Sequence, residues 1–206
     1  MYNKQKILAI IPARSGSKRL PGKNIKVFSG KPLIAHTLEQ AKTCWYFNEI
    51  FVSTDCPVVA SISEEYGLKV DFLRPSRLSE DDSSTIDVIM HVLDCFESKN
   101  TFFDLVVLLQ PTSPLRRVQD INDALQFFFD KDAEAVVSVC EAKHHPAWTN
   151  TLPEDMSMDS FLKEELKNNQ SLPKYYQLNG AIYIARIGYL KKNKSFIAEK
   201  TYAFEM

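Results

Sequence analysis

The sequence predicts an α/β fold of three layers, in which a mostly parallel, twisted sheet carries helices on both faces. Short runs of consecutive apolar residues, typical of strands buried on both faces, alternate with stretches whose apolar residues recur at helical spacing. This strand–helix–strand order is regular as far as Cys140, as expected for a parallel sheet. The 206 residues contain no linker rich in Gly, Ser or charge, so we expect residues 1–206 to form a single domain.

The first predicted unit is a strand, a long basic loop and a helix. The run KILAII at residues 6–11 is typical of a central strand, and it ends at Pro12. A loop with three glycines follows. Pro32 then begins a helical pattern whose apolar stripe extends from Leu33 to Trp45.

The following elements continue the same order. Ser84 is the expected N-cap of one helix, with Asp87 three residues later in a variant of the capping box. The predicted elements are strand 49–55, helix 58–66, strand 69–73, helix 84–96, strand 104–110, helix 120–129, strand 135–140, strand 180–185 and strand 201–206.

The order breaks between residues 141 and 178. This segment contains Pro146, Pro153 and Pro173 and has little periodicity. Since a stretch of this length inside a compact domain is more often a lid or an interface than an idle loop, we predict that 141–178 is a functional subdomain.

Positive charge is concentrated near the N-terminus. Although the net charge is −1, the first 38 residues contain eight Lys or Arg and no Asp or Glu. Arg14, Lys18, Arg19 and Lys23 lie in the first loop, beside the segment 15–17, whose backbone amides can approach an anion. Loops at the carboxyl ends of parallel strands share one crevice, so this pattern predicts a site for a triphosphate, which carries about four negative charges.

Several other classes of protein fit less well. The loop lacks the Gly-x-x-x-x-Gly-Lys-Ser/Thr and Gly-x-Gly-x-x-Gly patterns of P-loop and dinucleotide-binding enzymes. A nucleic-acid surface would need aromatic residues among the cations, and only Tyr2 and Phe28 are present there. No apolar run is long enough for a membrane span and no secretory signal is visible, so we expect a cytoplasmic protein.

The cysteines do not predict a metal centre. They are scattered, with no Cys-x-x-Cys pair and no His at ligand spacing. Adjacent side chains such as His144 and His145 do not converge easily on one ion, so we interpret both as structural. We expect buried free thiols at Cys44, Cys56, Cys95 and Cys140.

Seven short motifs occur in a distinctive order. They are IPARSGSKRLPGKN (11–24), KPLI (31–34), STD (53–55), LRP (73–75), LQPTSPLR (109–116), HHP (144–146) and NGAIYI (179–184). In sequence and order they resemble the motifs of the N-acylneuraminate cytidylyltransferases, also called CMP-sialic acid synthetases. The resemblance covers nearly the whole chain, and the first and fifth motifs are the most specific.

The resemblance implies a nucleotidyltransferase of the glycosyltransferase-A-like fold that transfers CMP from CTP to a nine-carbon acidic sugar, N-acetylneuraminate. The reaction would use Mg²⁺ and release pyrophosphate. The family also implies a homodimer, with 141–178 as an arm that crosses to the other subunit. The implied catalytic residues are Arg14, Lys18 and Lys23, the further nucleotide-binding residues are Ala13, Ser17, Asn24, Arg74 and Ser84, and the sugar-binding residues are Gln110, Thr112, Asn179, Tyr183 and Phe196.

One departure from the family pattern bears on activity. The family continues beyond its last strand into a metal-binding Asp-x-Asp segment, whereas this chain ends at Met206, so we expect a truncated form with poor activity. Mg²⁺ would then bind weakly through the nucleotide, with Asp55 as a carboxylate that could face the crevice.

The alternatives to transfer of CMP to N-acetylneuraminate are the same reaction on legionaminate or a related acid, and a non-catalytic nucleotide-binding dimer.

Overall fold

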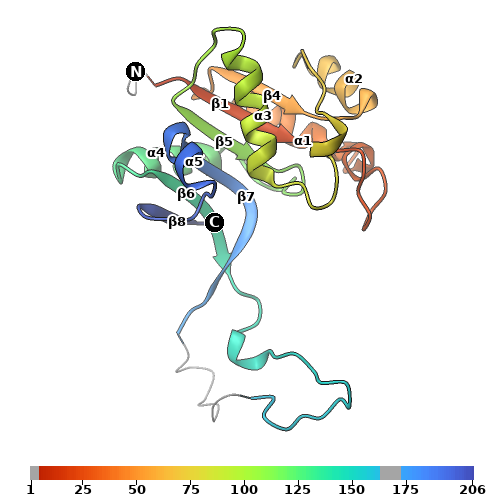
Figure 1. Ribbon diagram of the computed structural model, residues 1–206, viewed down its shortest axis with the longest axis vertical. Coiled ribbons are helices and arrows are strands. Elements are labelled where there is room, and N and C mark those ends of the chain that lie inside the picture. The colour runs from red at the N-terminus through yellow and green to blue at the C-terminus, as the bar shows by residue number, and fades with distance from the viewer. Residues whose placement is uncertain (1–4, 163–172) are drawn as a thin grey trace.

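The computed structural model describes residues 5–162 and 173–206, and its main feature is a six-stranded sheet in the order β4-β1-β5-β7-β6-β8 (Figure 1). Neighbouring strands are parallel except where β7 pairs with β5 and β6, so five strands point one way and β7 the other. The strands are β1 (Ile7–Pro12), β4 (Glu49–Ser53), β5 (Leu105–Leu109), β6 (Ala135–Glu141), β7 (Tyr176–Arg186) and β8 (Thr201–Glu205).

Helices cover both faces of the sheet, which confirms the predicted three layers. Alternate residues of β1 serve the two faces: Ile7 and Ile11 belong to one apolar cluster, and Leu8 and Ile10 to the other. The first cluster takes the buried sides of α1 (Leu33–Thr43), α2 (Pro57–Glu65) and α4 (Val118–Asp130), and the second takes those of α3 (Thr85–Glu97) and α5 (Ile187–Asn193).

Some predicted elements were wrong. Residues 69–73 form no strand. This segment is held at the sheet edge by side chains instead, since Phe72 stacks on Phe51 with ring centroids 4.3 Å apart. The helix predicted to reach Trp45 ends at Thr43, and Trp45 is 69% exposed rather than buried on the stripe. Helix α5 and the small hairpin of β2 (Val27–Phe28) and β3 (Lys31–Pro32) were not predicted.

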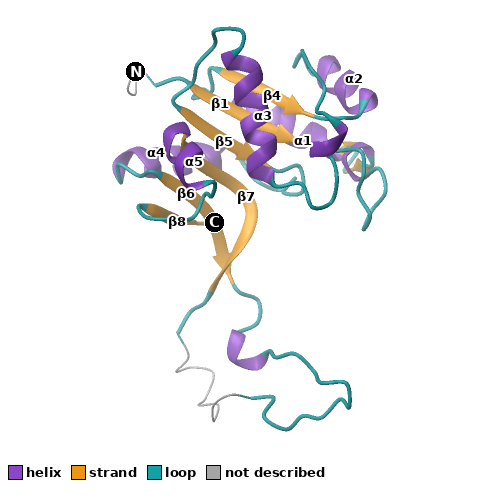
Figure 2. Cartoon of the chain, viewed as in Figure 1, coloured by secondary structure: helices purple, strands orange, loops and turns teal. Residues whose placement is uncertain are grey.

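Strands β6 and β7 continue beyond the sheet as a two-stranded ribbon, and the described residues between them, 142–162 and 173–175, lie away from the main body (Figures 1 and 2). The predicted subdomain 141–178 corresponds to this arm, although 163–172 lie outside the described residues. The arm includes a short helical turn, Pro146–Trp148, where the His145 Nδ1 accepts a hydrogen bond from the Ala147 N–H. Its part in dimerisation stays a prediction. No helix in the described ranges combines the length and apolar character needed to cross a membrane.

Candidate active site

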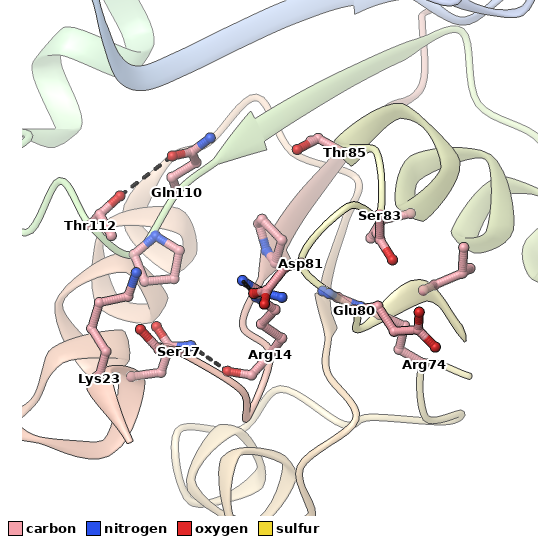
Figure 3. A pocket seen from close by; sticks show the side chains of 15 residues that line it. Arg14, Ser17, Lys23, Arg74, Glu80, Asp81, Ser83, Thr85, Gln110 and Thr112 are labelled. Carbon is pink, nitrogen blue, oxygen red and sulfur yellow. Dashed lines mark hydrogen bonds and ion pairs between the residues drawn. The ribbon is translucent and has the colours of Figure 1, made fainter. Parts of the chain in front are cut away.

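A cavity of about 270 Å³ opens at the carboxyl ends of β1 and β5 (Figure 3). Three segments form its walls: the first loop, the loop that leads into α3, and the loop after β5. The residues that line it are Pro12, Arg14, Ser17, Lys23, Asn24, Arg74, Leu78, Glu80, Asp81, Ser83, Thr85, Val88, Gln110, Pro111 and Thr112.

The first loop directs its cations toward an acidic residue from another segment. Arg14 donates to the Asp81 carboxylate at 2.7 Å and to the Ser79 carbonyl at 3.1 Å, and Lys18 also pairs with Asp81. Lys18 and Arg14 together lower the pKa of Asp81 below its ordinary value. Arg14 lines the main cavity, whereas Lys18 lines an adjoining hollow that also contains Asp81.

Hydrogen bonds fix the backbone of the same loop. The Asp55 carboxylate accepts from the Ser15 N–H at 2.8 Å and from the Ser15 hydroxyl at 2.6 Å, and Asn24 donates to the Arg14 carbonyl at 3.0 Å. Burial acts to raise the pKa of Asp55, but the bonds from Ser15 and the Arg74 charge outweigh it, so the pKa is lowered. Asp55 therefore stays ionised as an anchor for the loop.

Lys23 reaches the cavity because the chain turns sharply before it. Gly22 has φ 64°, a left-handed conformation that costs glycine little, and the short helix Lys23–Ile25 begins immediately after it. Lys23 and the buried Asn24 thus enter the cavity wall from one turn.

Arg74 is buried against the end of β4. Its Nε donates to the Ser53 hydroxyl at 3.1 Å and its Nη2 to the Ser53 carbonyl at 2.5 Å. Burial lowers the pKa of Arg74 to about 10, an effect that the nearby Asp55 opposes and Arg14 strengthens. Arg74 consequently lines the cavity and also ties its own segment to the end of β4.

Ser84, expected at the nucleotide, is not among the residues that line the cavity. Its hydroxyl accepts from the Ile86 N–H at 3.1 Å and caps α3, as the sequence predicted. The flanking Ser83 and Thr85 line the cavity instead. Ala13, another expected nucleotide residue, is fully buried, and its N–H donates to the Ser53 carbonyl at 2.9 Å.

The expected sugar-binding residues fall into two groups. Gln110 and Thr112 line the cavity, with the Thr112 hydroxyl 3.4 Å from the Gln110 Oε1 (Figure 3). Asn179, Tyr183 and Phe196 are not lining residues. Asn179 accepts from the Ser138 hydroxyl at 2.6 Å. The rings of Tyr183 and Phe196 lie 5.2 Å apart on the side of the sheet covered by α3.

Residues 8–203 match the family model described as cytidylyltransferase. The chain belongs to the cytidylyltransferase family. It is therefore a nucleotidyltransferase, as the motifs indicated.

Curated relatives fit this family assignment. The chain is 42% identical over 202 residues to the CMP-N,N'-diacetyllegionaminic acid synthase of Legionella pneumophila. The matched region covers 95% of this chain and 84% of the relative. It is 38% identical over 204 residues to the N-acylneuraminate cytidylyltransferase of Streptococcus agalactiae, covering 98% of this chain. The chain spans about half of that relative's length, 48%. The resemblance to N-acylneuraminate cytidylyltransferases is confirmed.

A solved structure supports the fold. The chain is similar to CMP:2-keto-3-deoxy-manno-octonic acid synthetase complexed with CTP, with a TM-score of 0.72 and 22% sequence identity. The match covers 98% of this chain and 90% of that one. The predicted nucleotidyltransferase fold is thereby confirmed.

Sequence reasoning missed the acidic side of this cytidylyltransferase's cavity. Glu80, Asp81 and Ser83 come from the segment before α3, to which the sequence analysis gave no role, and Thr85 is the first residue of α3. The acidic run 80–82 was the available signal, because it follows Arg74 at the edge of the same crevice.

Few side chains in the described part of the chain could bind the metal ion that the family generally uses. Among residues 5–162 and 173–206, no group of three or more His, Cys, Asp or Glu side chains could hold an ion. Glu80 and Asp81 are the carboxylates that line the cavity, and Asp81 is already paired with two cations. All four cysteines are free, as expected, although only Cys44 is fully buried.

Proposed function

We propose that this cytidylyltransferase activates a nine-carbon acidic sugar, a nonulosonic acid, by transferring CMP to it from CTP. The observation that carries the proposal is the cavity at the strand ends, where cations from the first loop face polar groups from the loop after β5. A triphosphate needs the first set of groups and a polyhydroxylated acceptor needs the second.

We propose that the nucleotide lies along the first loop. Arg14, Lys18 and Lys23 would bind the phosphates. Asn24 and Arg74 would contact the cytidine. Because Asp81 occupies Arg14 and Lys18 in this structure, the phosphates would replace its carboxylate as their partner.

The chemistry is an in-line displacement. The anomeric hydroxyl oxygen of the sugar attacks the α-phosphorus, a new O–P bond forms, and the bond from phosphorus to the bridging oxygen of the β-phosphate breaks. Pyrophosphate leaves with the electron pair, and the hydroxyl proton passes to a base. Catalysis then consists of positioning and stabilisation of charge on the leaving group by the three cations.

Mg²⁺ fits this site as an ion that enters with the nucleotide. It prefers oxygen ligands and is often held by substrate phosphates with one or two carboxylates. We propose Glu80 as the protein carboxylate nearest to this role, since Asp81 is committed to Arg14 and Lys18. The ion would neutralise phosphate charge.

The acceptor is proposed to contact Gln110 and Thr112 in the cavity, with Asn179, Tyr183 and Phe196 completing its site. N-acetylneuraminate is one candidate. The 42% identity to the Legionella pneumophila protein makes N,N'-diacetyllegionaminic acid the other.

The arm supports a proposed homodimer. Several large apolar side chains are exposed on it, among them Trp148 at 44%, Leu152 at 48% and Leu178 at 55%. Exposed apolar surface of this kind is typical of a protein interface.

A cytoplasmic location is part of the proposal because CTP is a cytoplasmic nucleotide.

Pyrophosphate release tests the proposal. The protein is mixed with CTP, Mg²⁺ and, separately, N-acetylneuraminate, N,N'-diacetyllegionaminic acid or an eight-carbon acid. Release above the no-sugar rate with a nine-carbon acid is expected. No sugar-dependent release with any acid would refute it.

A further inference from the structure

Arg116 is a buried arginine that joins three elements beside the cavity. Only 4% of its surface is exposed. Its Nη1 donates to the carbonyl of Ala181 at 2.7 Å and to that of Gln110 at 3.3 Å, and its Nη2 donates to Thr37 and Gln40 on α1 at 3.1 and 2.9 Å. One guanidinium thus connects the end of β5, strand β7 and helix α1.

This placement is energetically expensive. Burial lowers the pKa of Arg116 to about 10, and the nearby Asp120 only partly opposes the effect. The hydrogen bonds described for Arg116 go to neutral oxygens, and its buried Nε has no partner within the described part of the chain. Burying a charge in this way is costly, so a specific geometric role is the simplest reason to have it.

The geometry that Arg116 fixes is a close contact between Gln110 and Gly180. Gly180 has φ +73°, and a Cβ added there would lie 3.3 Å from the Gln110 Oε1. Arg116 holds the carbonyl of Gln110 itself and that of Ala181, the residue after Gly180. Both sides of the contact are therefore tied to the same side chain.

The Gln110 amide has little freedom in this arrangement. Its oxygen lies 3.4 Å from the Thr112 hydroxyl and would lie 3.3 Å from a Cβ at Gly180. A movement of β7 relative to β5 would reorient the amide within the cavity. It would leave Arg14 and Lys23, which come from the first loop, in place.

We propose that Arg116 is a positioning residue that fixes the Gln110 amide against Gly180 and so sets the binding of the acceptor sugar rather than of the nucleotide. This inference rests on the proposed function, in which Gln110 contacts the acceptor. It assigns a role to a side chain that does not line the cavity.

Steady-state kinetics on Arg116→Lys, with each substrate varied in turn, test the proposal. Lysine keeps the charge but cannot donate to four acceptors in the same plane. The KM for the acceptor is expected to rise by between about tenfold and 10²-fold, as for a displaced positioning group, with the KM for CTP nearly unchanged. Equal changes in both KM values would overturn the proposal.

Arg186→Met is the matched control. Arg186 is the last residue of β7, five positions after Ala181, donates to the Ala133 carbonyl at 3.1 Å and to Asp132 at 2.8 Å, and does not line the cavity. Its loss is expected to lower the melting temperature without separating the two KM values. If this control also raised the KM for the acceptor and left the KM for CTP unchanged, any loosening of β7 would be enough to weaken acceptor binding. That result would overturn the specific role of Arg116.

Two further experiments support the test. Gly180→Ala leaves Arg116 unchanged, and a crystal structure does not depend on activity. The added methyl group is expected to displace the Gln110 amide and give the same separation of KM values, with Arg116 intact. A crystal structure of Arg116→Lys should show the amide displaced from Gly180. An unmoved amide would overturn this inference alone, whereas wild-type protein inactive on every acid would refute the proposed function.

Discussion

We propose that the nucleotide chemistry depends most on two single residues, Arg14 and Lys23. Both line the cavity, and each comes from a loop whose backbone is fixed by Asp55, Asn24 or Gly22. Such fixed cations stabilise charge on a leaving pyrophosphate without a reorganisation cost at the moment of reaction.

Arg14→Ala and Lys23→Ala are each expected to lower turnover by roughly 10²–10³, the usual loss when one preorganised stabilising group is removed. The rate of pyrophosphate release at saturating substrates measures this. Arg19→Ala is the control, because Arg19 is an exposed cation of the same loop and does not line the cavity. Wild-type rates in both site variants would exclude their role.

Asp81→Asn is expected to tighten CTP binding a few-fold at low salt. The carboxylate pairs with both Arg14 and Lys18, so the amide would leave two cations free for phosphate. Calorimetric titration measures the dissociation constant, and the gain should shrink as salt screens the charges. Asp82→Asn, next in the chain but not a lining residue, should bind CTP as the wild type does. Weaker binding by Asp81→Asn would mean that this carboxylate organises the cations instead of competing for them.

Whole elements were predictable where apolar residues form a continuous run or recur at helical spacing. The continuous run at β1 and the helical stripes of α3 and α4 are such patterns, and their element types follow directly from the sequence. The direction of β7 did not follow, because residues 180–185 have the same apolar run whichever way the strand points. Its pairing with β5 is set by tertiary contacts, as is the failure of 69–73 to form a strand.

Ser84→Ala tests the start of α3. Loss of this N-cap is expected to lower the free energy of unfolding by about 0.5–2 kcal/mol, because the Ile86 N–H loses its acceptor. Urea unfolding measures the change. Ser98→Ala, at the other end of the same helix, should cost less, since Ser98 donates to the Cys95 carbonyl and leaves no N–H unpaired. A cost for Ser84→Ala no greater than that of the control would argue against the cap.

The molecule as a whole consists of the layered body that forms the cavity and the arm that leaves it on β6 and β7 (Figure 1). The basic half of the cavity could be anticipated from charge in one loop and from family motifs. The acidic half was missed, although the acidic run 80–82 was visible, because residues 79–84 have no periodicity and Glu80, Asp81 and Ser83 reach the cavity through the packing of α3 against the sheet. Similarly, the sequence predicted that Ser84 caps its helix, but it did not reveal that Thr85 lines the cavity and Ser84 does not.

The arm predicts a dimer in solution. Light scattering is expected to give the mass of two chains, and Leu178→Asp, which places a charge on exposed apolar surface of the ribbon, is expected to shift the protein toward monomer. Phe102→Asp is the control, because Phe102 is also exposed, at 58%, but lies on the body. A wild-type monomer at all concentrations would contradict the proposed assembly.

The product of the reaction tests the central claim most directly. Mass spectrometry of a mixture of the protein, CTP, Mg²⁺ and a nine-carbon acid should detect a CMP-linked sugar and pyrophosphate in equal amounts. The linked sugar should form roughly 10²–10³ times more slowly with Arg14→Ala under the same conditions. Hydrolysis of CTP without a linked sugar, or no product with any nine-carbon acid, would contradict the claim.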